Sequence, residues 1–433
     1  MPKYTHRRRN KGGKPVFAGA QGCVFLPSLK CKHRPRNAND GNISKLGYKE
    51  GSEFEMREYE KIAPFLKKIK NHEKYFNIRA SLCEPDVLTP NDLVDFNNVC
   101  KNFKEDINAS NVNSKLDKLR TINMPDLGID LKGWIEKAPL NAQRLRHLNN
   151  HLSELLVHAV VPMNQQGVMH NDLKSENIMM DKNDANMRII DWGLAGISTS
   201  YQLIPGRYFM NNPVTFNRPF STMIISSEID NLYAKFTAGA EPIEVFMKEL
   251  YKEYRKLAPT GHEYLTYIFE TMFNLKPEAA EVALNTAVEN YAAEILQHFT
   301  DPMRKKFKLN EYFDKVYRYN TDVWGVMSVF YTMFMLPRDH FSMTNAIYYD
   351  MLHRYRSLFR TVVFVNGHKR MNVQDIVHQL RQINDAVMMP KPIKFKNSNK
   401  SIKKKVKFNI GAHEGDHAHR YRIPTPYPLK WLH

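Results

Sequence analysis

Long apolar runs and an apolar leader are both missing from this 433-residue sequence. A helix that crosses a membrane needs roughly 20 apolar residues, and no run of about eighteen occurs, so we expect no membrane span. The first fourteen residues are basic and lack the apolar stretch of a secretory signal. We therefore expect an intracellular protein, whose length leaves room for two or three folded parts.

Cysteine is also scarce, with only Cys23, Cys31, Cys83 and Cys100 in the whole chain. Four cysteines in a chain of this length do not make a disulfide framework, a pattern that is typical of a reducing compartment. Cys23 and Cys31 are too far apart for a tight zinc site and have no Cys-x-x-Cys partner. We predict buried free thiols.

Acidic residues are few at the two ends of the chain, and this decides how the net charge of +18 is interpreted. Residues 1–14 carry +6 and residues 391–433 carry +9, which leaves +3 for everything between them. A nucleic-acid-binding domain would carry its positive charge on one folded face. The distribution instead indicates a nearly neutral globular protein with two basic tails.

Three carboxylate or amide side chains, Asp172, Asn177 and Asp191, fall within twenty residues of one another. The apolar pairs at 179–180 and 189–190 flank a polar turn, which predicts a hairpin of two buried strands. The hairpin would place Asp172 and Asn177 before its first strand and Asp191 after its second. Mg²⁺ is usually held by one or two such oxygens together with the phosphates of the substrate. The pattern therefore predicts a site for a magnesium-bound phosphate.

This stretch resembles the catalytic loop of protein kinases, His-Arg-Asp-Leu-x-x-x-Asn, and their metal-binding Asp-Phe-Gly motif. The run Asp-Leu-Lys-x-x-Asn is followed, fourteen residues after the Asn, by Asp-x-Gly. The resemblance implies that Asp172 accepts the proton of a substrate hydroxyl and that Lys174 steadies the migrating phosphoryl group. It also implies that Asn177 and Asp191 hold Mg²⁺ and that ATP is the phosphate donor.

Two residues depart from the kinase pattern. Asn171 stands where many kinases have the Arg that pairs with a phosphorylated activation loop, so we expect no control by that route. Trp192 replaces Phe, and Ile-Asp-Trp also occurs in small-molecule phosphotransferases related to aminoglycoside and choline kinases. Lys174, by contrast, is typical of serine/threonine protein kinases. A small-molecule phosphotransferase is therefore kept as an alternative.

Residues 17–25 resemble the kinase glycine-rich loop, Gly-x-Gly-x-x-Gly-x-Val. Phe17 falls at the position of the first Gly, which leaves Gly19 and Gly22 for a close approach to the phosphates. Val24 would pack on the adenine. Two glycines between apolar residues also fit an ordinary hairpin turn, but the match downstream favours the nucleotide loop.

A lysine on the third strand should reach the phosphates, and residues 43–46 resemble the kinase strand Val-Ala-Ile-Lys. We predict that Lys45 is this lysine. Lys30 is the competitor, but it follows Val24 by only six residues, too few to belong to the third strand.

The acidic partner of Lys45 should come from the next segment, because residues 52–68 have the apolar spacing of a helix. Glu55, Glu58 and Glu60 compete for this role. We predict Glu58, which lies one turn before Ile62.

The rest of the smaller lobe is less clearly patterned. Residues 78–82 and 118–124 are predicted to form the fourth and fifth strands, and the polar residues 91–115 between them indicate a surface insertion. Residues 124–127 resemble the hinge between the kinase lobes. The backbone of Met124 and Leu127 would then contact the adenine, and Gly128 would let the chain turn.

The larger lobe begins with apolar residues at helical spacing over 148–163, which predict a core helix that leads to His170. Residues 193–219 would form the activation segment. They end without the usual Ala-Pro-Glu, so the run Asn-Arg-Pro-Phe at 217–220 is interpreted as its substitute.

Beyond this segment, residues 226–319 have a helical pattern where ordinary kinases have a short connection, which indicates a helical insertion. Asp322 then begins a run that resembles Asp-x-Trp-x-x-Gly. The resemblance implies that Asp322 accepts hydrogen bonds from the backbone of the catalytic loop.

The resemblance therefore implies an α+β fold with two lobes, a small β-rich lobe over residues 15–127 and a large helical lobe over 128–390. Basic segments 1–14 and 391–433 would flank them. The pattern is similar to serine/threonine kinases of large nucleocytoplasmic DNA viruses. This narrower resemblance implies work in the cytoplasm or nucleus of an infected host cell, or packaging in the virion.

The predicted function is transfer of the γ-phosphoryl group of Mg-ATP to Ser or Thr of a protein substrate. A pseudokinase scaffold is a second alternative, because the glycine loop and the docking segment are degenerate. The C-terminal tail contains eight lysines between Lys391 and Lys407. It is interpreted as a solvated tail, or as a signal for nuclear import or for binding nucleic acid or an anionic surface, where affinity would fall steeply with salt.

Overall fold

The computed structural model describes residues 13–19, 22–32, 42–205, 216–225, 233, 242–257, 259–301 and 306–388. All of them belong to one compact unit, Met1–Pro390. The basic tail and nearly all of the N-terminal arm lie outside the described residues. Within the described ranges, no helix combines the length and the apolar character that a membrane crossing requires.

The N-terminal part is a five-stranded antiparallel sheet with the strand order β1-β2-β3-β5-β4. Its strands are β1 Lys14–Gly19, β2 Gly22–Leu26, β3 Asn42–Tyr48, β4 Ser81–Cys83 and β5 Leu119–Pro125. Successive side chains of a strand point to opposite faces. Cys23, Phe25 and Leu46 are therefore buried on one face, where they form a hydrophobic core with the segment before β5. Val24 and Lys45, which are paired across β2 and β3, lie on the other face.

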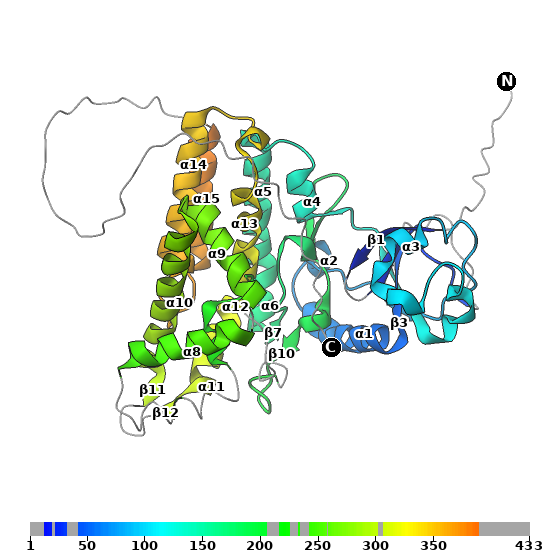
Figure 1. The fold of residues 1–433 in the computed structure, drawn as a ribbon, viewed down its shortest axis with the longest axis horizontal. Helices are drawn as coiled ribbons and strands as arrows, with labels where there is room; N and C mark the ends of the chain where they lie inside the picture. The colour runs from blue at the N-terminus through cyan, green and yellow to red at the C-terminus, as the bar shows by residue number, and fades with distance from the viewer. Residues whose placement is uncertain are drawn as a thin grey trace, which may run out of the picture. The chain divides into compact units, whose positions relative to one another are not determined.

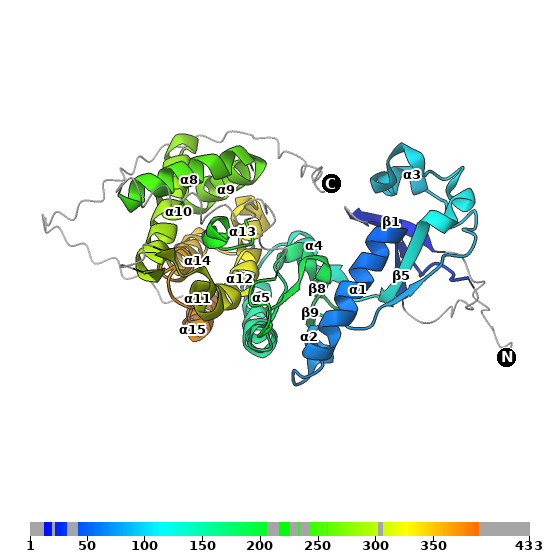
Figure 2. The same ribbon diagram turned by 90° about the horizontal axis from the view of Figure 1, so that it is seen from below.

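Helix α1 (Lys49–Leu66) follows β3 without a loop and packs against β3, β4 and β5. Figure 1 shows it beside β3, and Figure 2 shows it beside β5. It begins three residues earlier than the predicted helix. Its buried residues are Ser52, Glu58, Ile62 and Leu66, and the last three recur at the four-residue spacing of one helix face. The turn that follows contains α2 (His72–Tyr75).

The sequence analysis predicted that the polar segment 91–115 is a surface insertion, but part of this segment is buried. It folds into α3 (Phe96–Val99) and short 3₁₀ turns at Lys101–Asp106 and Val112–Ser114, with a further turn at Leu116–Lys118 before β5. Four apolar side chains from it are buried in the core of the sheet: Phe96, Phe103, Ile107 and Val112. The composition was misleading because a few well-spaced apolar residues are enough to anchor a polar segment.

The prediction of free thiols is wrong for all four cysteines. Cys23 is joined to Cys100 and Cys31 to Cys83. Each bond ties the sheet to a segment that is distant in the sequence, with separations of 77 and 52 residues. The cysteine count therefore gives no support for a reducing compartment, because stable disulfides are typical of oxidising ones.

Reducing both disulfides is expected to lower the free energy of unfolding of the sheet by about 2–4 kcal/mol for each bond, because each closes a long loop in the unfolded chain. Urea unfolding with and without a dithiol measures this loss. When the unreduced protein is denatured and treated with an alkylating reagent, none of the four cysteines should be modified. Modification of all four would contradict the pairing.

The hairpin predicted around residues 179–190 is present, and it is part of a second, three-stranded sheet. Strands β8 (Ile178–Met180) and β9 (Met187–Ile189) pair antiparallel, and β6 (Ile129–Asp130) pairs with β8. Strand β7 (Val168–Met169) precedes this stretch of chain and β10 (Gly196–Ile197) follows it, and the two strands pair antiparallel.

Helices form the remainder of the unit. The first group contains α4 Leu131–Glu136, α5 Ala142–Leu155 and α6 Val161–Gln165, the last two joined by a π-helical turn, Leu156–Val160. The predicted helical stretch 226–319 contains α8 Ile243–Leu257, α9 Pro259–Phe273, α10 Pro277–Phe299, the short strands β11 Thr300–Asp301 and β12 Lys306–Phe307, and α11 Leu309–Tyr312.

The last group begins with α12 Arg318–Met327 and α13 Val329–Phe334, and ends with α14 Asn345–Leu358 and α15 Val373–Met388. Helix α14 lies beside α15 (Figure 1). Helix α15 also packs on α5. One hydrophobic core runs from Ile62 on α1 through these helices to Val387. This core fixes α12 against the loop that precedes β8.

Candidate functional site

Asp172 lies at the centre of loop 170–177, between β7 and β8, and its carboxylate is surrounded by donors. The Lys174 ammonium lies 3.1 Å from Oδ1 and 2.9 Å from Oδ2. The Asn177 amide donates to Oδ2 at 2.9 Å and to the Asp172 carbonyl at 2.8 Å. Three of the residues predicted from the motif therefore meet in one hydrogen-bonded group.

The backbone of this loop is held by Asp322 on α12, which is fully buried. Its carboxylate accepts hydrogen bonds from the backbone N–H groups of His170 and Asn171, both at 2.9 Å, and from the Asn164 amide at 2.7 Å. Burial raises the pKa of the Asp322 carboxyl although these donors oppose the shift. This is the structural contact that the resemblance implied.

His170 connects the loop to Ile190, the residue that precedes Asp191. Its Nδ1 accepts the backbone N–H of Asp172 at 3.2 Å, so that Nε2 is the nitrogen that donates to the Ile190 carbonyl at 2.8 Å. The imidazole lies 4.9 Å from the Trp192 ring, which in turn lies 5.9 Å from Phe76. Trp192, which stands at the Phe position of the kinase motif, is therefore buried between two aromatic rings.

Asp191 lies two residues after the end of β9 and caps the 3₁₀ turn Trp192–Leu194. Its φ of 64° is left-handed, and its carboxylate accepts the backbone N–H of Gly193 at 3.3 Å. Burial would raise the pKa of this carboxyl, but the positive charge of Lys45 and the hydrogen bond from Gly193 hold it below its usual range. Although Asp191 is exposed by its accessible surface, the lowered pKa of its carboxyl favours the ionised form.

Lys45 points from β3 toward α1, where its ammonium contacts both oxygens of Glu55 at 2.9 and 2.7 Å. Both side chains are largely buried, at 17% and 14% exposed. Burial alone would lower the pKa of the Lys45 ammonium, but the negative charges of Glu55 and Asp191 raise it. Burial and the charge of Asp191 raise the pKa of the Glu55 carboxyl, against the opposing effect of Lys45.

The prediction of Glu58 as the partner of Lys45 is wrong. Glu58 lies on the same helix, but its carboxylate pairs with Lys61 at 2.7 Å, whose side chain is 62% exposed. Because α1 begins at Lys49 rather than at 52, the turn that faces β3 carries Glu55. The competitor Lys30 is also excluded, since it forms a surface ion pair with Asp86 at 2.8 Å.

Replacing Glu55 by Gln is expected to lower kcat/KM for ATP about 10–100-fold, because a charge-assisted hydrogen bond of about 1.5–3 kcal/mol no longer orients Lys45. Glu58→Gln is the matched control on the same helix and should stay within about twofold, since its ion pair to an exposed lysine is weak. Steady-state transfer assays of both variants decide the pairing. A larger loss for Glu58→Gln would refute it.

The residues predicted to cover the nucleotide lie beside Lys45. Gly19 and Gly22 are paired at the end of the β1–β2 hairpin, and Val24 is paired with Lys45. A Cβ atom on Gly22 would lie 2.8 Å from the Leu46 carbonyl and 3.0 Å from Cγ of Lys45. Gly22 is thus required for close packing of the hairpin on β3, a reason that the motif alone did not reveal.

The predicted hinge connects the two sheets. Met124 lies near the end of β5, where it is paired with Ile43, and Leu127 lies in the link to β6. Gly128 has a φ of 102°, and a Cβ atom there would clash with the Met180 carbonyl. The turn at Gly128 therefore depends on glycine, as the sequence analysis expected.

The groups that bind phosphate and metal by resemblance fall into one neighbourhood. Lys45 interacts with Asp191 through its charge, and Asp191 also feels the charge of Lys174. The Asn177 carbonyl accepts the backbone N–H of Ile190 at 3.0 Å, which joins the two halves of the metal motif. Glu55, the ion-pair partner of Lys45, is the residue near this group that the sequence analysis did not choose.

Mg²⁺ suits the donor set of this site. Asp191 supplies an ionised carboxylate, and Asn177 turns its NH₂ group toward Asp172, which leaves Oδ1 as the group available to a cation. Two hard oxygens from the protein are the number with which Mg²⁺ is usually held beside phosphates. These two residues would hold the ion.

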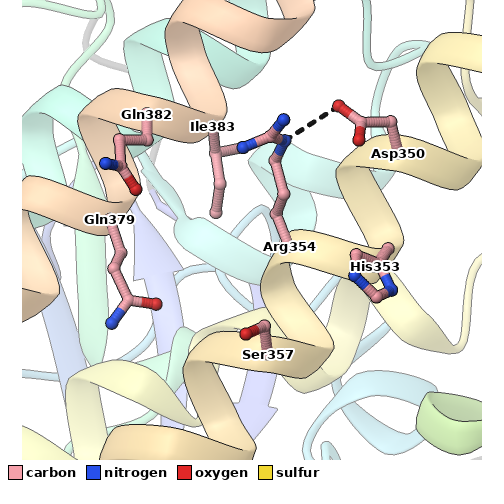
Figure 3. A pocket seen from close by; sticks show the side chains of 7 residues that line it. All are labelled: Asp350, His353, Arg354, Ser357, Gln379, Gln382 and Ile383. Carbon is pink, nitrogen blue, oxygen red and sulfur yellow. Dashed lines mark hydrogen bonds and ion pairs between the residues drawn. The ribbon is translucent and has the colours of Figure 1, made fainter.

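A pocket of about 270 Å³ lies elsewhere, between α14 and α15 (Figure 3). Its walls include the ion pair of Arg354 and Asp350, whose side chains are both about 40% exposed. None of its lining residues belongs to the group around Asp172. We assign it no part in the chemistry of that group.

Comparison with known proteins finds a family model whose match includes Asp172, Asn177 and Asp191, and a short similarity to one relative. Residues 129–215 match the family model described as protein kinase domain. A 46-residue stretch is 46% identical to the serine/threonine-protein kinase kin-29 of Caenorhabditis elegans, which is 11% of this chain and 6% of that protein. The part of the chain around loop 170–177 is therefore similar to protein kinase domains, and the chain spans only a small part of the length of the relative that it matches.

Proposed function

We propose that this protein is an ATP-dependent protein kinase with the two-lobed kinase fold, which transfers the γ-phosphoryl group of Mg-ATP to Ser or Thr hydroxyls of a protein substrate. The observation that carries the proposal is the hydrogen-bonded group of Asp172, Lys174 and Asn177. Asp191 lies close enough to this group and to Lys45, which is paired with Glu55, for the charges of Lys174 and Lys45 to lower its pKa. Loop 170–177 presents Asp172 and Lys174 to the same region.

Each side chain has a task that its contacts support. Asp172, whose carboxylate is kept in place by amide donors, accepts the proton of the substrate hydroxyl. Lys45, oriented by Glu55, and Lys174 supply positive charge where the transferred phosphoryl group is most negative. A magnesium ion held by Asn177 and Asp191 would neutralise phosphate charge. Positioning and electrostatics then provide most of the rate, as phosphoryl transfer requires.

Ser/Thr specificity rests on Lys174 and on the short similarity to a serine/threonine kinase. Lys174 contacts Asp172 directly, so that both can face one acceptor hydroxyl. The small-molecule alternative rests on Trp192, which packs on His170 and Phe76. That packing is a core contact and gives no preference for a small acceptor.

The test is radiolabelled phosphate transfer by the full chain from Mg-ATP to a panel of acceptors. The panel contains a basic protein, an acidic protein, an aminoglycoside, a hexose and choline. The proposal expects label on serine or threonine of a protein. Label on a small molecule would favour the phosphotransferase alternative, and a thermal shift with Mg-ATP but no transfer would favour the scaffold.

The narrower predictions stay predictions. They are the similarity to kinases of large nucleocytoplasmic DNA viruses, work in the cytoplasm or nucleus of an infected cell or in the virion, and binding of nucleic acid or an anionic surface by the basic tails. Deleting residues 391–433 and measuring DNA retention at two salt concentrations tests the tail. Retention that is unchanged at both concentrations would refute its role.

A further inference from the structure

The segment 216–218 lies against loop 170–177, although more than forty residues separate them in the sequence. Asn217 and Arg218 are both buried, at 2% and 6% exposed. Neither belongs to the groups that would bind nucleotide or metal. The burial of these two polar side chains against the loop therefore needs another explanation.

Asn217 contacts two consecutive residues of the loop with one amide group. Its Nδ2 donates to Oδ1 of Asp172 at 2.9 Å and to the Leu173 carbonyl at 3.1 Å. Oδ2 of the same carboxylate accepts from Asn177 at 2.9 Å. The two oxygens of Asp172 thus each have a neutral amide donor, one from within the loop and one from outside it.

Arg218 holds the residue before Asp172. Its Nε donates to the Asn171 carbonyl at 2.7 Å. Asn171 has a left-handed φ of 63°, a conformation that costs free energy for most residues. Its N–H is held by Asp322 and its carbonyl by Arg218, so both ends of this backbone unit are fixed.

The segment itself is anchored on α12. Trp324 donates its indole N–H to the Phe216 carbonyl at 3.1 Å, and its ring lies 4.9 Å from that of Phe220. On the same helix, a Cβ atom on Gly325 would lie 2.6 Å from Cβ of Leu173. Helix α12 therefore holds the loop from one side directly and from the other side through segment 216–218.

We propose that Asn217 and Arg218 are a pair of positioning residues that fix the backbone of residues 171–173 and the carboxylate of Asp172 for phosphoryl transfer. The proposal rests on the proposed function for the chemistry, but the positioning itself is a separate physical claim. In the proposed function Lys174 also interacts with the transferred phosphoryl group, and this interaction competes with its contact to the Asp172 carboxylate. The neutral Asn217 amide has no such competing attraction.

The variant Asn217→Asp keeps the shape of the side chain but replaces the NH₂ donor by an oxygen. Its kcat for protein phosphorylation is expected to fall about 10–100-fold, because a hydrogen bond to a charged group is lost and the carboxylate is displaced. KM for ATP should be unchanged, since Lys45 and Asp191 are untouched. Asn217→Ser, which retains a donor, should keep more activity than Asn217→Ala.

Asn183→Asp is the matched control, because it makes the same change at an exposed position of the β8–β9 turn. Its kcat should equal that of the wild type. Arg218→Met has a similar length and no N–H donor, and it is expected to lower kcat with unchanged KM for ATP. Urea unfolding of each variant shows whether the fold is retained.

Hydrogen exchange of the full chain separates this proposal from the proposed function. Asn217→Ala should speed exchange of the amides of residues 170–173 about tenfold, because the opening of the loop becomes easier by roughly the free energy of one hydrogen bond. The five-stranded sheet should be unaffected. Unchanged loop exchange in Asn217→Ala and Arg218→Met would overturn the proposal even if the wild type transfers phosphate, and faster exchange would support it even if the wild type does not.

Discussion

Asp172→Asn is expected to lower kcat about 10²–10⁴-fold, the contribution typical of a positioned general base. The shape of the side chain is kept, so Mg-ATP should still bind with an unchanged thermal shift. Only one oxygen remains for the three donors of Lys174, Asn177 and Asn217, so the free energy of unfolding should fall by about 1–2 kcal/mol. Single-turnover transfer from radiolabelled ATP measures the chemical step.

The control for this variant is Asp385→Asn, which removes one negative charge from an exposed position of α15. It should transfer phosphate at the rate of the wild type. If Asp172→Asn were as active as Asp385→Asn, Asp172 would not be the base.

Asp322→Ala is expected to lower the free energy of unfolding by about 2–5 kcal/mol, because the buried backbone N–H groups of His170 and Asn171 and one of the two hydrogen bonds donated by the Asn164 amide would lose their acceptor. Transfer activity should fall as well, since the residues next to Asp172 lose their support. Urea unfolding at neutral pH measures the first effect, and transfer assays at a temperature well below the melting transition measure the second.

Asp314→Ala provides the comparison for Asp322→Ala. Asp314 pairs with Arg318 on the adjoining helix, and its side chain is 46% exposed. Exposed pairs of this kind contribute about 0–1 kcal/mol. Equal destabilisation by the two substitutions would show that Asp322 does not hold the loop.

The loop and its hairpin could be located from the sequence because their pattern depends on short-range spacing. The residues around Asp172, Asn177 and Asp191 carry the motif within twenty positions, and the strands predicted at 179–180 and 189–190 are found as β8 and β9, within one or two residues. The lysine on β3 could be predicted in the same way, because the residues around it form a buried strand.

The choice between Glu55 and Glu58 could not be made from the sequence. The two residues are three positions apart on one helix and both turn toward the protein, so a shift of the helix start decides which of them meets Lys45. The start could not be located because the N-cap residue, Tyr48, makes no side-chain cap. The usual signal for a helix beginning was therefore missing.

The disulfides and Asn217 were missed for a different reason. Cysteine pairing depends on which distant segments meet, and the polar composition of 91–115 hid the apolar residues that bring Cys100 to Cys23. Asn217 was noted only as part of a degenerate docking segment, and no local pattern indicates that its amide reaches Asp172. Contacts across more than forty residues require the fold.

The central claim is that Lys45 and Lys174, from distant parts of the chain, face the same phosphates. An ATP analogue with an amine-reactive acyl group on its terminal phosphate tests this most directly, with the labelled lysines identified by mass spectrometry. The account predicts label on Lys45 and Lys174, suppressed by excess Mg-ATP. Label on Lys30 or Lys61 instead, or label that Mg-ATP does not suppress, would contradict it.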